Sequence, residues 1–194
     1  MDEGSSGRLS SSSTGAPTDS TVSSESDPAA DDEARSISTR PPKTAKTVDL
    51  NAYDLPQFVA TREFIKGDGN CQYRALAHLL YGDQSLHEAV RRLIVGEIND
   101  NSHRYDESLS ESGHTFAARQ SANGEWGVEQ TLAAAARVFG KKIIVLSLAS
   151  DRPFFLAYGS RDVDSNAPGL LFENNHYELL YRKAFGTQVT SRGQ

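Results

Sequence analysis

The chain passes from a polar turn into a predicted helix at Gly67-Asp68-Gly69-Asn70-Cys71-Gln72-Tyr73-Arg74-Ala75, and this stretch holds the only cysteine of its 194 residues. Two glycines allow backbone angles that other residues disfavour, and Asn70 is a residue type that caps helices. A cysteine in a first helical turn lies at the positive end of the helix dipole, which favours thiolate over thiol. The unpaired N–H groups of that turn can also bind a negative oxygen. The pattern is therefore typical of a hydrolase with a cysteine nucleophile.

The composition limits the kinds of partner. The formal net charge is −6, and no basic run is long enough to indicate binding to nucleic acid. A single cysteine excludes an internal disulfide and suits a reducing compartment. The first residues lack the apolar stretch of a secretory signal, and no apolar run could span a bilayer. We therefore expect a cytoplasmic, intracellular protein without nucleic-acid or membrane partners.

Three segments of different composition divide the chain. Residues 1–47 are rich in Ser, Thr, Asp, Glu, Ala and Pro and contain no aromatic residue. Such a segment buries too little apolar surface to offset its chain entropy, which predicts a disordered tail. A solvated tail is the plain interpretation, and a delivery element of a pathogen effector or viral protein working in a host cell is the alternative. Residues 48–185 form the predicted folded domain, and 186–194 a flexible end.

Apolar spacing predicts helices first and strands later. The helix after Cys71 carries apolar residues three and four apart, and Ser85 with Glu88 forms a capping box that opens a second helix reaching Ile98. A short helix is expected at 115–120, and another at 129–139 that ends at Gly140. Predicted strands cover 143–146, 154–158, 170–172 and 176–181. This order predicts an α+β fold, a small sheet flanked by helices.

A thiol nucleophile needs a base, and five histidines are available. His78 and His87 lie in predicted helices, and His103 and His114 lie in a polar stretch. His176 differs, because it begins an apolar strand directly after two asparagines, so that a loop delivers it to a sheet edge. We predict that His176 is the base.

Several residues could complete the site. Residues two apart on a strand share a face, so Glu178 could orient the His176 imidazole, and so could Asn174 if the strand began earlier. The Asp68 side chain could fix the turn, and its backbone N–H could join that of Cys71 in binding the oxyanion. Within the same turn, Gly69 and Asn70 are further candidates for binding the oxyanion or substrate.

Trp126 is either a core or platform residue beside Gly127 or a border of the substrate groove.

Other site types lack the residues that they need. The paired spacings of a zinc centre are absent, and so is the Walker lysine of a nucleotide loop. We therefore expect neither a metal nor a cofactor.

The stretch Asp68–Ala75 closely resembles the nucleophile motif of the ovarian-tumour (OTU) family of cysteine deubiquitinases. The resemblance continues through Leu79–Gln84 and the following predicted helix, returns at Glu125-Trp126-Gly127, and closes at Asn175-His176-Tyr177, which is similar to the family's histidine motif. It covers the chain from about Phe58 to Tyr181. It implies a papain-like OTU fold, with a small central, mostly antiparallel sheet flanked by helices.

The resemblance also implies an activity. Cys71 would attack the carbonyl of the C-terminal glycine of ubiquitin, usually in an isopeptide bond, and His176 would act as base and then as acid through a thioester. The glycine turn and the Trp126-Gly127 corner would line a narrow channel for the two terminal glycines of ubiquitin. Partners would be ubiquitin or polyubiquitin chains. The same chemistry on a ubiquitin-like modifier and an inactive ubiquitin-binding module are the alternatives.

One position departs from the family pattern. Two residues after the histidine the family commonly has Asp or Asn, whereas this chain has Glu178. Three alternatives therefore remain: Glu178 orients the imidazole, Asn174 orients it, or the site has no strong third residue.

Overall fold

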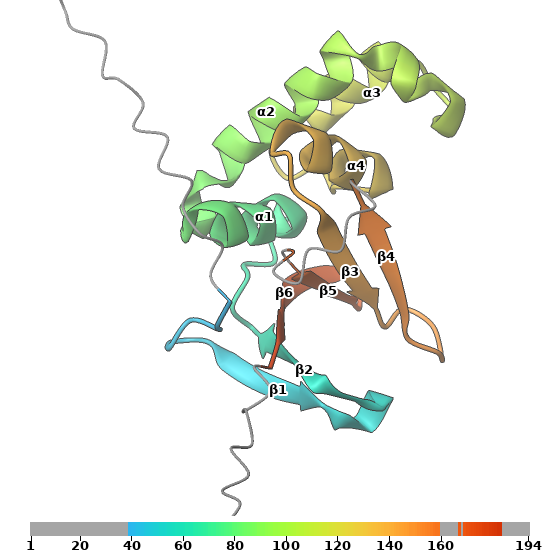
Figure 1. Cartoon of the computed structure of the whole chain (residues 1–194). Coiled ribbons are helices and arrows are strands. Elements are labelled where there is room, and N and C mark those ends of the chain that lie inside the picture. The colour runs from blue at the N-terminus through green and yellow to red at the C-terminus, as the bar shows by residue number, and fades with distance from the viewer. Residues whose placement is uncertain (1–38, 160–166, 168, 184–194) are drawn as a thin grey trace, which may run out of the picture. The chain divides into compact units, whose positions relative to one another are not determined.

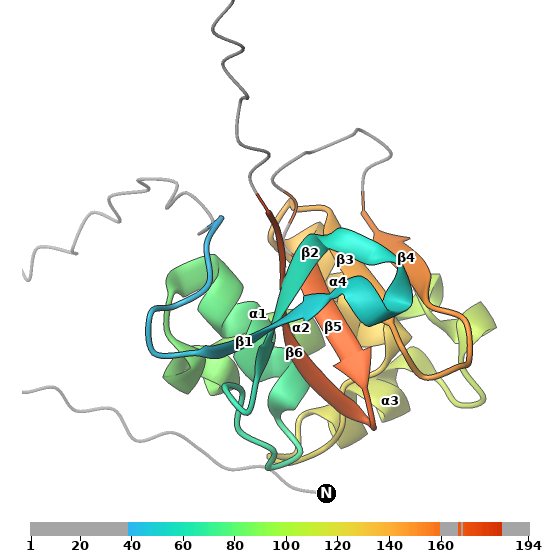
Figure 2. The same ribbon diagram turned by 90° about the horizontal axis from the view of Figure 1, so that it is seen from below.

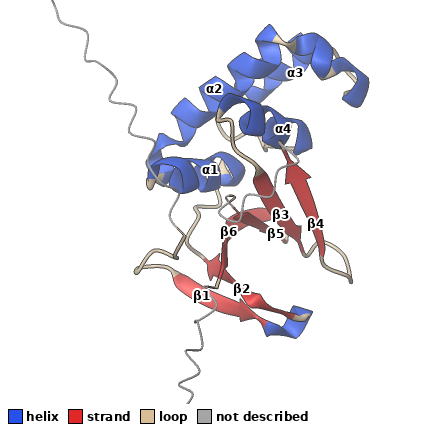
Figure 3. Ribbon diagram, viewed as in Figure 1, coloured by secondary structure: helices blue, strands red, loops and turns tan. Residues whose placement is uncertain are grey.

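The computed structural model describes residues 39–159, 167 and 169–183. Helices gather on one side of a six-stranded sheet (Figures 1 and 3). The helices are α1 (Cys71–Tyr81), α2 (His87–Asp100), α3 (Gly113–Gln120) and α4 (Glu129–Val138). The strands are β1 (Lys46–Leu50), β2 (Leu55–Arg62), β3 (Ile143–Ser147), β4 (Phe154–Tyr158), β5 (Gly169–Glu173) and β6 (His176–Arg182). The predicted α+β class is confirmed.

The sheet has the strand order β1-β2-β6-β5-β3-β4, and every neighbouring pair is antiparallel except β3 with β5. The larger core fills the space between the helices and one face of the sheet, and it contains Tyr73, Ile94, Leu132 and Leu179. A smaller core lies on the other face, around Leu50, Leu146 and Leu171.

The sheet curls over the smaller core. The rings of Phe58 on β2 and Phe155 on β4 lie 5.4 Å apart between centroids, although three strands separate β2 from β4 in the sheet order. Figure 2 shows the β1–β2 hairpin crossing the face opposite the helices. The sheet therefore covers much of its own second face without a second layer of helices.

The expectation that helices come first is wrong, because β1 and β2 precede α1. Strand β1 lies at an edge and is mostly exposed, and β2 shows no clean alternation of buried and exposed side chains. Neither strand therefore carries the period of two that reveals a half-buried strand. Strand β1 also begins at Lys46, two residues before the predicted start of the folded domain.

The predicted later elements are confirmed within a residue or two, but one helix start differs. A 3-10 turn, Gln84–Leu86, precedes α2, and the Asp83 side chain accepts a hydrogen bond from the Ser85 backbone N–H at 2.8 Å. The predicted Ser85–Glu88 capping box is therefore wrong, since Asp83 caps this turn and α2 begins only at His87. Among the described residues, no helix is long and apolar enough to cross a bilayer.

The predicted disordered tail, apart from residues 39–47, and the predicted flexible end at 186–194 lie outside the described residues. Residues 160–166 and 168, between β4 and β5, also lie outside them.

Candidate active site

Cys71 is the first residue of α1, half-buried, with its thiol against the start of β6. Burial raises the pKa of this thiol, and the negative charge of Asp68 acts in the same direction. The backbone N–H groups of Tyr177, Gln72 and Cys71 itself lie close enough to the sulfur to lower the pKa. Burial is the largest of these effects, so the pKa of the thiol is raised, opposite to the direction expected from the helix terminus alone. A base would therefore assist deprotonation of Cys71.

His176 directly precedes Tyr177, whose backbone N–H lies near this thiol. The His176 Nε2 lies 3.1 Å from the backbone oxygen of Ile65, and a carbonyl only accepts hydrogen bonds. The proton of the neutral ring therefore belongs on Nε2, which leaves Nδ1 as the basic nitrogen. A Cβ built on Gly67 would lie 3.8 Å from both Nδ1 and Cε1, so the glycine turn contacts this side of the ring. Since the Tyr177 N–H reaches the Cys71 sulfur, the two predicted reactive residues lie in one site.

Strand β6 is an interior strand, between β2 and β5. The expectation that His176 sits at a sheet edge is therefore wrong: it lies at the end of an interior strand. The residues that follow β2 contribute directly to the histidine's surroundings, since the Ile65 backbone oxygen lies 3.1 Å from its Nε2.

Glu178 is only 4% exposed, which corrects its interpretation as a surface glutamate on an edge strand. Its Oε1 lies 3.5 Å from His176 Nε2 and accepts a hydrogen bond from the Phe64 N–H at 3.0 Å. Its Oε2 accepts a hydrogen bond from Thr61 Oγ1 at 2.5 Å. Glu178 thus contacts the imidazole and also fixes the backbone that presents the Ile65 oxygen to it.

Asn174 occupies a different place. It lies exposed in the turn between β5 and β6, with a φ of 51°. Within the described part of the chain it forms no hydrogen bond to His176. Of the two candidates for orienting the imidazole, the structure brings Glu178 to the ring.

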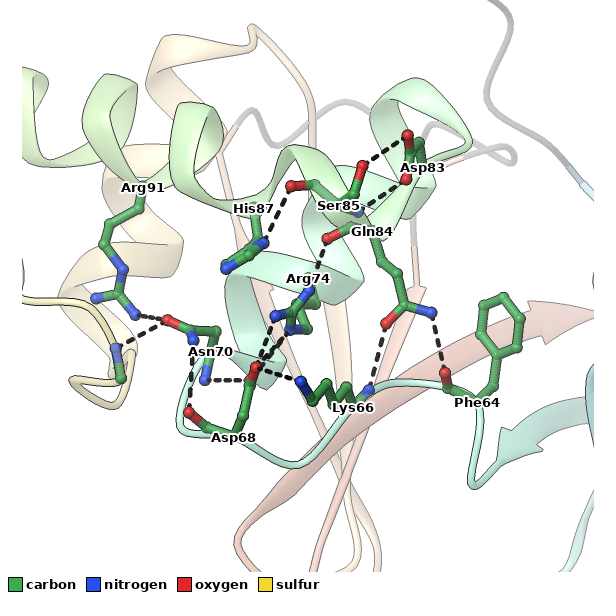
Figure 4. Close-up of polar contacts among 11 residues, drawn as sticks. Phe64, Lys66, Asp68, Asn70, Arg74, Asp83, Gln84, Ser85, His87 and Arg91 are labelled. Atoms are coloured by element: carbon green, nitrogen blue, oxygen red, sulfur yellow. Dashed lines mark hydrogen bonds and ion pairs between the residues drawn. The ribbon is translucent and has the colours of Figure 1, made fainter.

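Asp68 shapes the turn through its carboxylate (Figure 4). Arg74 Nε donates to Oδ1 at 3.0 Å and Arg74 Nη2 donates to Oδ2 at 2.6 Å, and these bonds hold the pKa of Asp68 well below its usual range. The backbone N–H of Asn70 donates to Oδ1 of the same carboxylate at 3.2 Å. Arg74 also donates to the Gln84 carbonyl, which ties the turn to the segment before α2.

The backbone N–H groups of the turn divide into two kinds. That of Asn70 already donates to Asp68, so the prediction that it binds the oxyanion is not supported by this geometry. The N–H groups of Asp68, Gly69 and Cys71 have no oxygen acceptor among the described residues.

Asn70 stands at the N-cap position, but its side chain does not cap α1. Its Oδ1 instead accepts from the Gly124 N–H at 3.0 Å and from Arg91 Nη2 at 2.7 Å.

A largely apolar cavity of about 390 Å³ opens beside Cys71. Helix α4 and strands β3, β4 and β5 supply most of its walls, together with the Trp126-Gly127 corner. Trp126 is 60% exposed, so its interpretation as a core residue is wrong and its interpretation as a border of the groove fits. The described lining residues are Cys71, Trp126, Gly127, Val128, Glu129, Leu132, Val145, Ser147, Ala149, Phe154, Leu156, Tyr158, Phe172, Asn175 and Tyr177.

The nucleophile turn and the start of α1 approach the 124–127 segment closely. A Cβ on Gly69, whose φ is +81°, would lie 2.1 Å from the Gly124 oxygen. A Cβ on Gly127 would lie 2.2 Å from Gln72 Oε1. Only glycine fits at these contacts without moving backbone or a buried amide.

Sequence reasoning missed several supporting residues: Thr61, Ile65, Gln72, Arg74 and Arg91. Arg74, six residues from Asp68, could have been found from that spacing, since it shares the first turns of α1 with Cys71. The others act through contacts between distant segments, which no local pattern reveals. Among the described residues, no group of three or more His, Cys, Asp and Glu side chains could hold a metal ion.

Comparison with known proteins gives consistent matches. The family described as OTU-like cysteine protease matches residues 66–177. The chain is 31% identical over 137 residues to OVARIAN TUMOR DOMAIN-containing deubiquitinating enzyme 10 of Arabidopsis thaliana, covering 71% of this chain and 38% of that protein. It is 32% identical over 133 residues to enzyme 12 of the same organism, covering 68% and 58%. The chain thus spans less than two thirds of the length of either relative.

Solved structures share the fold. The OTU domain of OTUD1 superposes with a TM-score of 0.58 at 24% identity, covering 68% of this chain and 90% of that domain. The Hazara virus OTU domain bound to ubiquitin superposes with a TM-score of 0.53 at 16% identity, covering 77% and 97%.

Proposed function

This chain belongs to the OTU-like cysteine protease family, and we propose that it is a deubiquitinase that hydrolyses the bond after the C-terminal glycine of ubiquitin. The observation that carries the proposal is the thiol of Cys71 at the start of α1, against the His176–Tyr177 backbone. The relatives named as deubiquitinating enzymes support this activity. The Hazara virus OTU domain bound to ubiquitin supports ubiquitin as the partner.

The first half of the reaction forms a thioester. His176 Nδ1 takes the proton of the Cys71 thiol as the sulfur attacks the carbonyl carbon of the terminal glycine. Because burial raises the pKa of the Cys71 thiol, the attack depends on this proton transfer to His176. The backbone N–H groups of Asp68, Gly69 and Cys71 are the donors available for the oxyanion. The C–N bond then breaks, and the proton on His176 passes to the leaving amine.

The second half regenerates the enzyme. His176 takes a proton from a water molecule, whose oxygen attacks the thioester carbonyl. The C–S bond breaks, ubiquitin leaves with a free carboxylate, and the sulfur regains its proton. The Ile65 carbonyl keeps the Nε2 proton in place through both halves, and the Glu178 carboxylate stabilises the charged imidazolium from 3.5 Å.

We place the two terminal glycines of ubiquitin in the cavity beside the thiol, along the Trp126-Gly127 corner. The exposed ring of Trp126 forms one border of the same groove. A reaction that depends on a free thiol also suits the reducing cytoplasm, where we place the protein.

A covalent probe tests the proposal. Full-length ubiquitin that carries a thiol-reactive group at its C-terminus is incubated with the wild-type chain and with Cys71→Ala. We expect a mass increase of one ubiquitin in the wild type and none in the variant. Because Cys71 is the only cysteine, the site of the adduct needs no mapping.

Probes built on ubiquitin-like modifiers distinguish the alternatives. An adduct with such a probe but not with the ubiquitin probe would show that the enzyme acts on that modifier rather than on ubiquitin. Binding of ubiquitin without any adduct would indicate an inactive binding module, and the proposed activity would be wrong.

A further inference from the structure

The guanidinium of Arg91, on α2, lies directly behind the nucleophile turn. Arg91 is only 3% exposed, and its guanidinium carbon lies 3.8 Å from the centroid of the Tyr73 ring. No carboxylate among the described residues forms an ion pair with it. A buried cation without a carboxylate is costly, so its contacts need a reason.

Those contacts reach both walls of the groove. Arg91 Nη2 donates to Asn70 Oδ1 at 2.7 Å and to the Glu125 carbonyl at 2.7 Å, and Nη1 donates to the Gln120 carbonyl at 2.8 Å. Asn70 directly precedes the nucleophile, and Glu125 directly precedes Trp126. Figure 4 shows Arg91 and Arg74 approaching the turn from α2 and α1.

Two further residues complete the connection. The Gly124 N–H donates to the same Asn70 Oδ1 at 3.0 Å. Gln120 Nε2 donates to the Trp126 carbonyl at 3.0 Å, and Gln120 Oε1 accepts from the Tyr73 hydroxyl at 2.7 Å. The turn and the Trp126 wall thus share one set of hydrogen bonds with Arg91 at its centre.

We propose that Arg91 is a positioning residue, which acts through Asn70 to hold the nucleophile turn at a fixed distance from the 120–126 segment. The three acceptors lie in two segments that are 50 residues or more apart in sequence, and the planar guanidinium satisfies them at once. A small displacement of the turn would move the N–H groups that face the oxyanion. The catalytic part of this inference rests on the proposed function, whereas its structural part does not.

The test replaces Arg91 by Met, which keeps a long apolar side chain over Tyr73 and removes the donors. Arg92→Met is the matched control, because Arg92 is the next residue of α2 and is exposed. Two quantities are measured: hydrogen exchange of the Gly124 amide, and kcat and KM on ubiquitin with a C-terminal fluorogenic amide. We expect Gly124 exchange to accelerate about tenfold or more and kcat to fall by about tenfold or more, with KM within about twofold. Arg92→Met should change neither.

Three outcomes would overturn the proposal. Unchanged Gly124 exchange would show that Arg91 does not hold the two segments together. Equal acceleration of exchange throughout the core would mark a general loss of stability. A normal kcat with faster Gly124 exchange would show that this link does not serve catalysis. If the wild type does not cleave the ubiquitin substrate, the proposed function fails, and Gly124 exchange still decides whether Arg91 positions the turn.

Arg91→Lys covers the case in which Arg91→Met does not fold. Lysine keeps the charge but cannot present the planar fork to three acceptors. We expect faster Gly124 exchange and a lower kcat for this variant too, and full protection with full activity would overturn the proposal. In an Asn70→Ala background, Arg91→Lys should lower kcat little further, because both changes remove the same link.

Discussion

The two halves of the candidate site are built in different ways. On the nucleophile side, the Asp68 carboxylate is held by Arg74 and by the Asn70 N–H, so its closest partners lie within six residues. On the histidine side, the Ile65 carbonyl reaches His176 from 111 residues away, and Thr61 reaches Glu178 from 117 residues away. The first half forms largely within one turn and one helix, whereas the second exists only when β2 and β6 pair.

Because of this difference, substitutions in the two halves should have different effects on turnover and on folding. A change in the nucleophile turn alters groups that contact the reacting atoms, so it should affect turnover more than folding. A change around Glu178 removes buried hydrogen bonds between distant strands, so it should affect folding at least as much as turnover.

Loss of either reactive side chain should have the largest effect. Cys71→Ala and His176→Ala should each lower turnover of a ubiquitin substrate by about 10⁴-fold or more, because one removes the nucleophile and the other its base. Steady-state hydrolysis of ubiquitin with a C-terminal fluorogenic amide measures this. Melting temperatures close to that of the wild type would confirm that both variants are folded, and appreciable turnover by either would contradict its assigned role.

Gly69→Ala should come next. A Cβ there meets the Gly124 oxygen at 2.1 Å, so the turn must move, and we expect turnover to fall about 10²-fold. Gly82→Ala is the matched control, since Gly82 ends the same helix with a φ of +74° and a Cβ added there would meet nothing within 4 Å. Both variants carry the backbone cost of about 1–2 kcal/mol, but only Gly69→Ala should lose activity. Equal turnover in the two variants would show that the clash with the Gly124 oxygen does not lower activity beyond the backbone strain that both variants share.

Glu178→Ala should lower turnover much less than Cys71→Ala or His176→Ala, by about tenfold, because the Ile65 carbonyl still holds the imidazole. Its cost should instead be in stability, about 1–3 kcal/mol, since Thr61 Oγ1 and the Phe64 N–H lose their acceptor. Denaturant unfolding and turnover are measured together, with Asn174→Gly as the comparison at the other candidate position. A loss of turnover equal to that of His176→Ala would make the carboxylate essential and would sink the prediction.

The smallest effect concerns pH. Because burial raises the pKa of the Cys71 thiol, a smaller fraction is thiolate at a given pH than in an exposed cysteine. The rate of alkylation by iodoacetamide should therefore rise with pH through a midpoint above that of a cysteine-containing peptide measured in parallel. A midpoint below that of the peptide would instead indicate a preformed thiolate.

Most of the nucleophile half could be predicted from the sequence. The glycine turn and the start of the helix at Cys71 follow from local patterns, whereas the sequence left Trp126 open between a core or platform residue and a border of the groove. The direction of the Cys71 pKa shift did not follow, because the helix terminus is a local feature while the burial that outweighs it depends on the rest of the fold, including the start of β6.

The histidine half could be predicted only in part. His176 at the start of an apolar strand was visible, and so was Glu178 on the same face. The burial of Glu178 was not, because β6 becomes an interior strand only through β2, whose sequence lacks a strand's alternation.

The sequence by itself determined the chemical identity of the site: one thiol at a glycine turn before a helix, and one histidine at the start of a late strand. These depend on backbone angles, capping positions and apolar periodicity, which act over a few residues. Only the tertiary structure decided the sheet order, the partners of the imidazole and the place of Arg91 between two segments. Those features depend on contacts between residues far apart in the chain, whose pairing is fixed by burial of the whole core rather than by any short segment.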